Sequence, residues 1–208
     1  MWFEKGINNP DHDFHDLQQM AVDSALDGDF LVEVGSFVGE SMHSLIDKGK
    51  KTNKKLKYIT VDCFDIDLMC KDDDEAENYY HDMDKPMAGG ITPNNWIKKY
   101  GPRCILVEYF NNLHLAKKNN DMHSVIVSKS YEAADYFKDG SVHFCFIDAG
   151  HSYGNVTKDL NASFPKMQYN GLLCGHDWHG EGVRKAVIDF AEKKNMKIYT
   201  TVSSWVLR

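Results

Sequence analysis

Two segments of the chain combine aspartate and histidine in a pattern that suits acid–base chemistry or metal binding. The first runs from Asp148 to His151 (Asp-Ala-Gly-His), and the second is the pair His176-Asp177. Each segment follows a short apolar run that is typical of a buried β-strand. The ends of neighbouring parallel strands meet at one edge of a sheet, so we expect these carboxyl and imidazole groups to converge on one crevice.

Within this cluster, we expect Asp148, His176 and Asp177 to bind a divalent cation. Oxygen ligands favour Mg²⁺ or Mn²⁺, whereas an imidazole ligand also suits iron or zinc. Such a cation would lower the pKa of a substrate hydroxyl. His151 is then predicted to be the general base, because an imidazole with an ordinary pKa of about 6.5 accepts a proton near neutrality. The alternatives are that Asp148 only positions a cofactor or caps a helix, and that His176 is a hydrogen-bonded core histidine.

A glycine-containing turn follows the first predicted strand and has the form Glu33-x-Gly35-x-x-x-Gly39. Gly35 allows the backbone to turn tightly and to approach a ligand without a Cβ in the way. Gly39 lies where a helix should begin, and free N–H groups at a helix N-terminus attract anionic groups such as a carboxylate. Glu33 is a carboxylate within an apolar strand, so it needs a polar partner, which a ligand ammonium group would supply. The spacing differs from the G-x-G-x-x-G of dinucleotide sites.

An acidic residue, Asp62, ends the second predicted strand. A carboxylate in this position can accept hydrogen bonds from both hydroxyls of a ribose, as it does in dinucleotide-binding enzymes. Asp62 therefore predicts a cofactor that contains a nucleoside, without deciding which one. A helix or loop cap is the alternative interpretation.

The elements that would position these residues alternate as short apolar runs and longer amphipathic segments, which predicts βα units around a mostly parallel sheet. Strands are expected at 30–34, 58–62, 124–127, 142–147 and 172–175. Helices are expected at about 13–26, from about 39, and at about 95–100, 104–117, 130–137, 153–167 and 183–194. The runs 197–202 and 205–207 are too close for a helical crossover, so we expect them to form an antiparallel hairpin at the sheet edge.

Residues 65–95 interrupt this alternation with a charge cluster and a loop-like stretch that contains proline and glycine. Connections within βα units usually have about two to six residues, and much longer ones are commonly functional. We expect a cap over the active site that selects the substrate. A surface insertion without a functional role is the alternative.

The composition limits the classes of function. The 208 residues suffice for a single domain, and no apolar run approaches the roughly 20 residues of a membrane span. The net charge of −7 disfavours a nucleic-acid partner. The N-terminus shows no signal-peptide pattern, and the five cysteines show no C-x-x-C spacing. We therefore expect a cytoplasmic protein with a small-molecule substrate and no membrane partner, and we leave a homo-oligomer open.

Together, these motifs resemble class I S-adenosylmethionine (SAM)-dependent methyltransferases. Within that class they are similar to the small-molecule branch that includes macrocin-type sugar O-methyltransferases and cephalosporin-hydroxylase-like proteins. The resemblance covers about residues 28–62 and 122–190. Its motifs are the run from Glu33 to Ser41, the run from Ile147 to Tyr153, Val156, Asp159-Leu160, Gly171, Gly175-His176-Asp177 and Gly182-Val183-x-x-Ala186-Val187.

The resemblance implies a Rossmann-like, doubly wound α/β fold with a seven-stranded sheet whose last strand is reversed. It places SAM over the glycine turn, the ribose on the acid of the second strand, and the adenine near the residues after the third strand. The cofactor-binding residues that it implies are Glu33, Gly35, Ser36, Phe37, Gly39, Ser41, Asp62, Ser130, Tyr131 and Asp148.

In metal-dependent members, an acid after strand four and an acidic pair after strand five hold Mg²⁺, and these positions match Asp148, His176 and Asp177. The His-Asp pair departs from two carboxylates, which weakens the case for Mg²⁺. Related chains often carry aspartate as a candidate base where this chain has Gly150, and this departure favours His151 as the base.

The expected function is therefore SAM-dependent O-methylation of a hydroxyl on a small molecule, such as a sugar or a glycan precursor. Two alternatives remain open at this point. One is a metal-dependent oxygenase or hydrolase that uses the Asp/His cluster without SAM. The other is a non-catalytic subunit with the SAM-binding fold that binds a partner protein.

Overall fold

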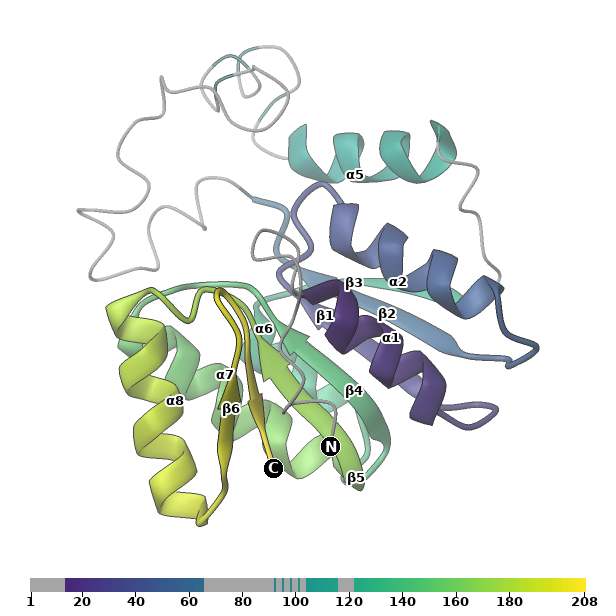
Figure 1. Cartoon of the computed structure of the whole chain (residues 1–208). Coiled ribbons are helices and arrows are strands. Elements are labelled where there is room, and N and C mark those ends of the chain that lie inside the picture. Colours follow the sequence, from purple (N-terminus) through teal and green to yellow (C-terminus); the bar gives the residue numbers. More distant parts are fainter. Residues whose placement is uncertain are drawn as a thin grey trace.

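The computed structural model describes residues 14–65, 92, 95, 98, 101, 104–115 and 122–208. Within this part of the chain, a seven-stranded sheet has the order β3-β2-β1-β4-β5-β7-β6 (Figure 1). The strands are β1 (Phe30–Val34), β2 (Lys57–Asp62), β3 (His123–Val127), β4 (Val142–Ile147), β5 (Met167–Gly175), β6 (Ile198–Thr200) and β7 (Trp205–Leu207). Strands β1 to β5 are parallel, whereas β7 is antiparallel to both β5 and β6. The predicted mostly parallel sheet with an antiparallel C-terminal hairpin is confirmed.

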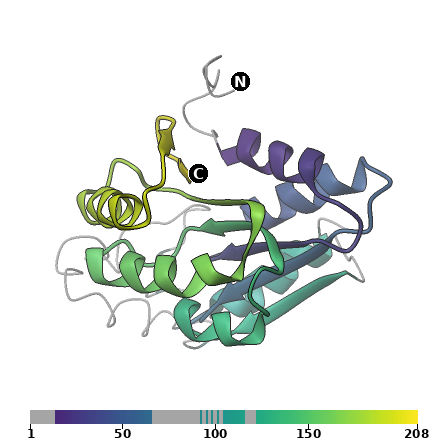
Figure 2. The same cartoon turned by 90° about the horizontal axis from the view of Figure 1, so that it is seen from below.

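Helices cover both faces of this sheet. The helices are α1 (Phe14–Ser24), α2 (Glu40–Lys50), α5 (Cys104–Leu115), α6 (Ser130–Ala133), α7 (Tyr153–Ser163) and α8 (Glu181–Lys194). Helices α1, α2 and α5 pack on one face, and α6, α7 and α8 pack on the other. Figure 2 shows α1 and α2 on the side of the sheet opposite to α6 and α7. The structure thus confirms the predicted doubly wound α/β architecture.

Side chains of the central strand β1 alternate between the two helical layers, as strand geometry requires. Leu31 packs with α1 and α2, whereas Val32 and Val34 join the cluster of the other face. Glu33 therefore lies on the same face as Leu31. This alternation brings the carboxylate of Glu33 beneath the first turn of α2.

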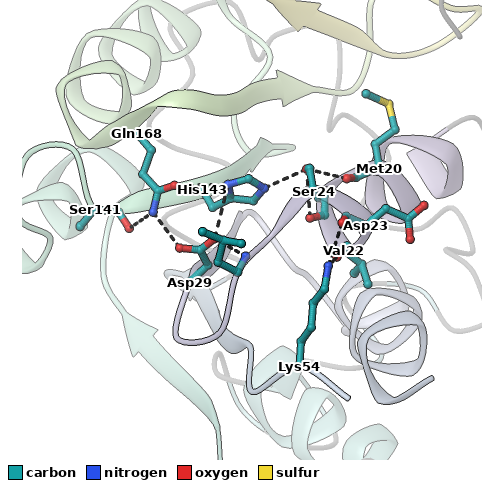
Figure 3. A network of polar contacts seen from close by, with 11 residues as sticks. Met20, Val22, Asp23, Ser24, Asp29, Lys54, Ser141, His143 and Gln168 are labelled. Atoms are coloured by element: carbon teal, nitrogen blue, oxygen red, sulfur yellow. Dashed lines mark hydrogen bonds and ion pairs between the residues drawn. The ribbon is translucent and has the colours of Figure 1, made fainter. Parts of the chain in front are cut away.

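A buried histidine joins several elements at the amino edge of the sheet, opposite to the strand ends of the predicted site (Figure 3). His143, near the start of β4, has Nε2 at 3.0 Å from Ser24 Oγ and Nδ1 at 3.3 Å from Gln168 Oε1. Gln168 in turn donates from Nε2 to Asp29 Oδ1 at 2.9 Å. These contacts tie the beginnings of β4 and β5 to the end of α1 and to the residue before β1.

Several predicted boundaries differ from the structure. Strand β5 starts at Met167, earlier than the predicted start at 172, because residues 168–171 (Gln-Tyr-Asn-Gly) do not form an apolar run. Helix α7 ends at Ser163, and a 3₁₀ helix, Phe164–Lys166, continues it. The predicted cap at 65–95 and the helix at 95–100 lie almost entirely outside the described residues. Among the described residues, no helix combines the length and apolar character needed to cross a membrane.

Candidate functional site

The glycine turn after β1 lies directly against the end of β4. Gly35 has a φ of 86°, and a Cβ built on it would lie 2.0 Å from the carbonyl oxygen of Asp148. Its N–H donates to the carbonyl of Val61 at 2.8 Å, which also ties the turn to β2. Only glycine fits both the backbone angle and the available space. The predicted cofactor turn and the predicted reaction centre are therefore adjacent at the carboxyl edge of the sheet.

Helix α2 begins immediately after this turn, with Gly39 as its N-cap residue. A Cβ on Gly39 would lie 2.8 Å from the ring of Tyr109, so this position also has room only for glycine. Because the N-cap residue is glycine, it makes no side-chain hydrogen bond to the N-terminus of α2. Its first N–H groups and the positive end of the helix dipole are thus available for an anion such as a carboxylate.

Glu33 is buried beneath this helix start and is held by serine hydroxyls. Ser36 Oγ donates to Glu33 Oε2 at 2.5 Å, and the Ser41 hydroxyl also hydrogen-bonds the Glu33 carboxylate. Burial raises the pKa of Glu33 to about 7, although the two serine hydrogen bonds oppose this shift. Gln18 of α1 donates from Nε2 to Ser41 Oγ at 2.9 Å. Glu33 therefore ties the glycine turn to the start of α2 through its serine hydrogen bonds. A direct contact between Glu33 and a cofactor stays a prediction.

Asp62 joins the loops that follow β1 and β2. Its Oδ2 accepts the N–H of Phe37 at 2.9 Å, and its Oδ1 accepts the N–H of Phe64 at 2.7 Å. Burial raises the pKa of Asp62, and the backbone hydrogen bonds counteract part of that rise. Each carboxylate oxygen can accept a second hydrogen bond, so the predicted role in ribose binding is chemically feasible but untested.

Backbone strain is concentrated at this edge of the sheet. Phe37, Phe64 and Asp177 have positive φ angles of 47°, 48° and 56° and follow β1, β2 and β5 respectively. Non-glycine residues adopt this conformation at a cost, and such residues cluster at functional sites. Asn195, with a φ of 54°, is instead the ordinary C-cap of α8.

The aspartate and histidine residues after β4 and β5 converge as the sequence predicted. His151 Nε2 lies 2.7 Å from Asp177 Oδ2, and His176 Nδ1 lies 3.5 Å from Asp177 Oδ1. Burial alone would raise the pKa of Asp177, but the hydrogen bonds from His151 and His176 hold it well below its usual range. The exposed His179 lies farther out, at 3.7 Å from Asp177 Oδ1. Asp177 is therefore an ionised carboxylate that favours a positive charge on its histidine neighbours.

Asp148 completes the cluster from the end of β4. Burial raises the pKa of Asp148 to about 6, while His176, at 3.8 Å, favours its ionised form. Among the described residues, Asp148, His151 and Asp177 have ligand atoms that all lie within 4.8 Å of one another, as a shared metal ion requires. His176 is not part of this trio, although it was predicted as a ligand in place of His151.

The loops that carry these residues are held by contacts that the sequence did not reveal. A Cβ on Gly182, in the first turn of α8, would lie 2.5 Å from the carbonyl oxygen of His151. Trp205 of β7 donates from Nε1 to the carbonyl of His176 at 3.0 Å. The ring of Phe14 packs edge-on against the His176 imidazole at 6.2 Å. The C-terminal hairpin and α1 thus support the same site.

The two residues predicted near the adenine lie at the start of α6. The Ser130 hydroxyl donates to Asp159 of α7, and Lys158 lies over the Tyr131 ring at 5.3 Å. Asp159 is buried, and its Oδ2 has no hydrogen-bond partner among the described residues. Burial raises the pKa of Asp159 to about 7. In the sequence, Asp159 stood out only as part of the family motif. That motif did not reveal the hydrogen bond between Asp159 and Ser130.

Comparison with known structures supports the fold. The O-methyltransferase NovP matches with a TM-score of 0.60 and 12% identity, over 94% of this chain and 78% of NovP. The SAH-bound Podospora anserina methyltransferase PaMTH1 matches with a TM-score of 0.60 and 10% identity, over 100% and 84% of the two chains. CalS11, a TDP-rhamnose 3′-O-methyltransferase, matches with a TM-score of 0.54 and 12% identity, over 94% and 77%. These identities are low, so the matches establish the fold alone.

Sequence comparison gives a more specific result. No curated protein matches this chain at a significant level. The family model described as a methyltransferase domain matches residues 32–178, which include the glycine turn, Asp62 and the Asp148–Asp177 cluster. This family model therefore matches more than half of the chain. The chain therefore belongs to the methyltransferase-domain family and has the class I fold of SAM-dependent methyltransferases.

Proposed function

We propose that this protein transfers the methyl group of SAM to a hydroxyl oxygen of a small molecule, such as a sugar or a glycan precursor. The observation that carries the proposal is the contact between Gly35 and Asp148, which joins the cofactor turn to the Asp/His cluster. A methyl donor bound at the cofactor turn would therefore present its methyl group to the side chains of the Asp/His cluster. Membership of the methyltransferase-domain family supports SAM as the methyl donor.

The residues of the turn fit SAM. The close approach at Gly35 leaves a cradle that a Cβ would fill. The uncapped N-terminus of α2 suits the SAM carboxylate, and the buried carboxylate of Glu33 suits the positive charge of its ammonium group. Asp62 would accept hydrogen bonds from the ribose, and Ser130 and Tyr131 would lie beside the adenine.

His151 is the proposed general base. When bound, SAM supplies a sulfonium methyl group that an acceptor oxygen attacks, and SAH remains after the C–S bond breaks. His151 takes the proton of the acceptor hydroxyl, and the ionised Asp177 at 2.7 Å stabilises the resulting imidazolium. This arrangement of an acid behind a histidine is a common way to orient an imidazole and to favour its protonated form.

A divalent cation, Mg²⁺ or Mn²⁺, is a further element of the proposal. Asp148, His151 and Asp177 offer two carboxylates and one imidazole within ligand distance of one another. This donor set suits Mn²⁺ better than Mg²⁺, because Mg²⁺ prefers oxygen ligands alone. A cation held there would supply Lewis-acid activation of the acceptor hydroxyl. In that state, His151 would serve as a ligand, and the metal would take over part of the role of the base.

The proposal is tested with methyl-labelled SAM and a panel of free sugars and nucleotide-linked sugars, each with Mn²⁺, Mg²⁺ or EDTA. We expect labelled product with a hydroxyl acceptor, and a loss of about 100-fold or more in His151→Ala. Tyr153→Phe is the control, because this exposed hydroxyl bonds Asp189 on the outside of the α7–α8 layer. Unchanged turnover in His151→Ala would remove the base assignment. Stabilisation by Fe²⁺ with 2-oxoglutarate, and none by SAM, would instead favour an oxygenase.

A further inference from the structure

Helix α5 contacts the glycine turn from the side opposite to the Asp/His cluster, and the sequence motifs do not include it. We propose that Asn112 and Tyr109 of α5 are positioning residues for the cofactor. They hold the Val38–Gly39 peptide in the orientation that presents the N-terminus of α2 to the amino-acid end of SAM. This inference rests on the proposed function, because it concerns how the same cofactor is held.

The peptide group between Val38 and Gly39 is fixed at both of its polar ends. Asn112 Nδ2 donates to the carbonyl oxygen of Val38 at 3.0 Å. The N–H of Gly39, which belongs to the same planar peptide group, donates to the carbonyl of Ser36 at 2.7 Å. A planar group that is bonded at both ends cannot rotate without breaking one of these bonds. Asn112 therefore determines how the chain enters α2.

Tyr109 packs its ring against Gly39 and so connects the Val38–Gly39 peptide to the sheet. Its side chain is fully buried, and its ring atoms would lie 2.8 and 2.9 Å from a Cβ on Gly39. The Tyr109 hydroxyl lies 2.6 Å from Thr60 Oγ1 of β2 and 3.1 Å from His123 Nε2 of β3. The position of the turn relative to β2 is thus set by a residue that lies far away in sequence.

The effect should fall on one end of the cofactor. The N-cap residue Gly39 gives no side-chain hydrogen bond to the first N–H groups of α2, so these groups suit the carboxylate at the amino-acid end of SAM. The adenosine end would lie instead near Asp62 and α6. Loosening the Val38–Gly39 peptide should therefore weaken the binding of ligands that have the amino-acid end, and it should spare ligands that lack it.

The chain offers a matched pair of variants for this test. Asn112→Ala removes the hydrogen bond to Val38, and Asn112→Asp replaces the donor amide with an isosteric carboxylate that cannot donate. Asn111→Ala makes the same substitution as Asn112→Ala one position earlier on α5, at an exposed residue. Binding of SAH and of 5′-methylthioadenosine, which lacks the amino-acid end, is measured by calorimetry, with thermal unfolding of the free proteins as a check of folding.

We expect Asn112→Ala to weaken SAH binding about five- to tenfold, and Asn112→Asp to weaken it at least as much, since one partly buried hydrogen bond is lost. Methylthioadenosine binding should stay within about twofold of that of the wild type in both variants. Asn111→Ala should bind both ligands like the wild type. A loss of affinity for both ligands in parallel would indicate a merely structural role and overturn the inference, as would wild-type SAH affinity in both Asn112 variants. If the wild-type protein itself failed to bind SAH, the proposed function would fall, and the inference with it.

Discussion

Gly35 and Asp148 are in such close contact that a single methyl group at position 35 would overlap the carbonyl oxygen of Asp148, at 2.0 Å. The two residues directly follow β1 and β4, which are neighbours in the centre of the sheet. The N–H of Asp148 also donates to the carbonyl of Val34 at 2.7 Å. The floor of the proposed cofactor site and the start of the proposed reaction centre thus lie on two neighbouring strands whose ends are in direct contact.

The variant Gly35→Ala should therefore lose SAH binding and unfold at a lower temperature. The clash involves backbone atoms of two central strands, which cannot move aside as a flexible side chain can. Gly28→Ala is the control, because Gly28 has a similar φ of 89° but open space around its Cβ position. That control should lose only about 1 kcal/mol of stability through backbone strain and should bind SAH normally. Equal SAH affinity in the two variants would contradict the assigned contact.

Glu33 should make the stability of the free protein depend on pH. Its folded-state pKa of about 7 lies above the ordinary value of 4.5, so the folded protein binds the proton more tightly than the unfolded chain does. This stabilising contribution is complete below about pH 4.5 and is lost as the pH rises towards 7, at about 1.4 kcal/mol per pKa unit. Urea unfolding of Glu33→Gln should show a smaller loss of stability than the wild type between pH 5 and 8. A parallel pH profile would show that Glu33 is not the group responsible.

Asp159 should act in the same direction through a separate site. Burial raises its pKa to about 7 from 3.8, so its contribution to stability is also lost as the pH rises from about 4 to 7. Asp159→Asn removes the charge and keeps an acceptor for the Ser130 hydroxyl. We expect this variant to be more stable than the wild type at pH 8, with little difference at pH 5. Asp139→Asn, at an exposed carboxylate, is the control. Destabilisation of Asp159→Asn at pH 8 would rule out this explanation.

The charge of Asp177 should matter for turnover more than its shape does. Asparagine tolerates the left-handed backbone angle of this position, so Asp177→Asn removes the charge without adding strain. We expect methyl transfer to fall at least tenfold because the imidazolium of His151 loses its partner. Asp177→Ala should fall as far and should also be less stable to urea by about 1 kcal/mol, because alanine is strained at this angle. Full activity in Asp177→Asn would show that the His151–Asp177 pair does not take part in the reaction.

Local pattern in the sequence determined much of the fold. Apolar runs located β1 to β4 within one residue of their bounds. For β1, β2 and β4 the reason is that strands buried on both faces are mostly apolar, whereas the edge strand β3 is only partly buried. The same rule missed the start of β5, since residues 168–171 do not form an apolar run and are partly or fully exposed. The closely spaced runs at the C-terminus were enough to predict the antiparallel hairpin, because too few residues separate them for a crossover.

The sequence also determined which chemical groups end up at the carboxyl edge. A glycine turn after β1, an acid at the end of β2 and the Asp/His segments after β4 and β5 must share that edge, because parallel strands all point the same way. What only the tertiary structure decided is how these side chains pair. It places His151 Nε2 at 2.7 Å from Asp177 and His176 Nδ1 at 3.5 Å, and it brings Asn112 to Val38 across 74 positions of the chain. The physical reason is that strand periodicity is a local property, whereas these pairings depend on rotamers and on how distant helices pack against the sheet.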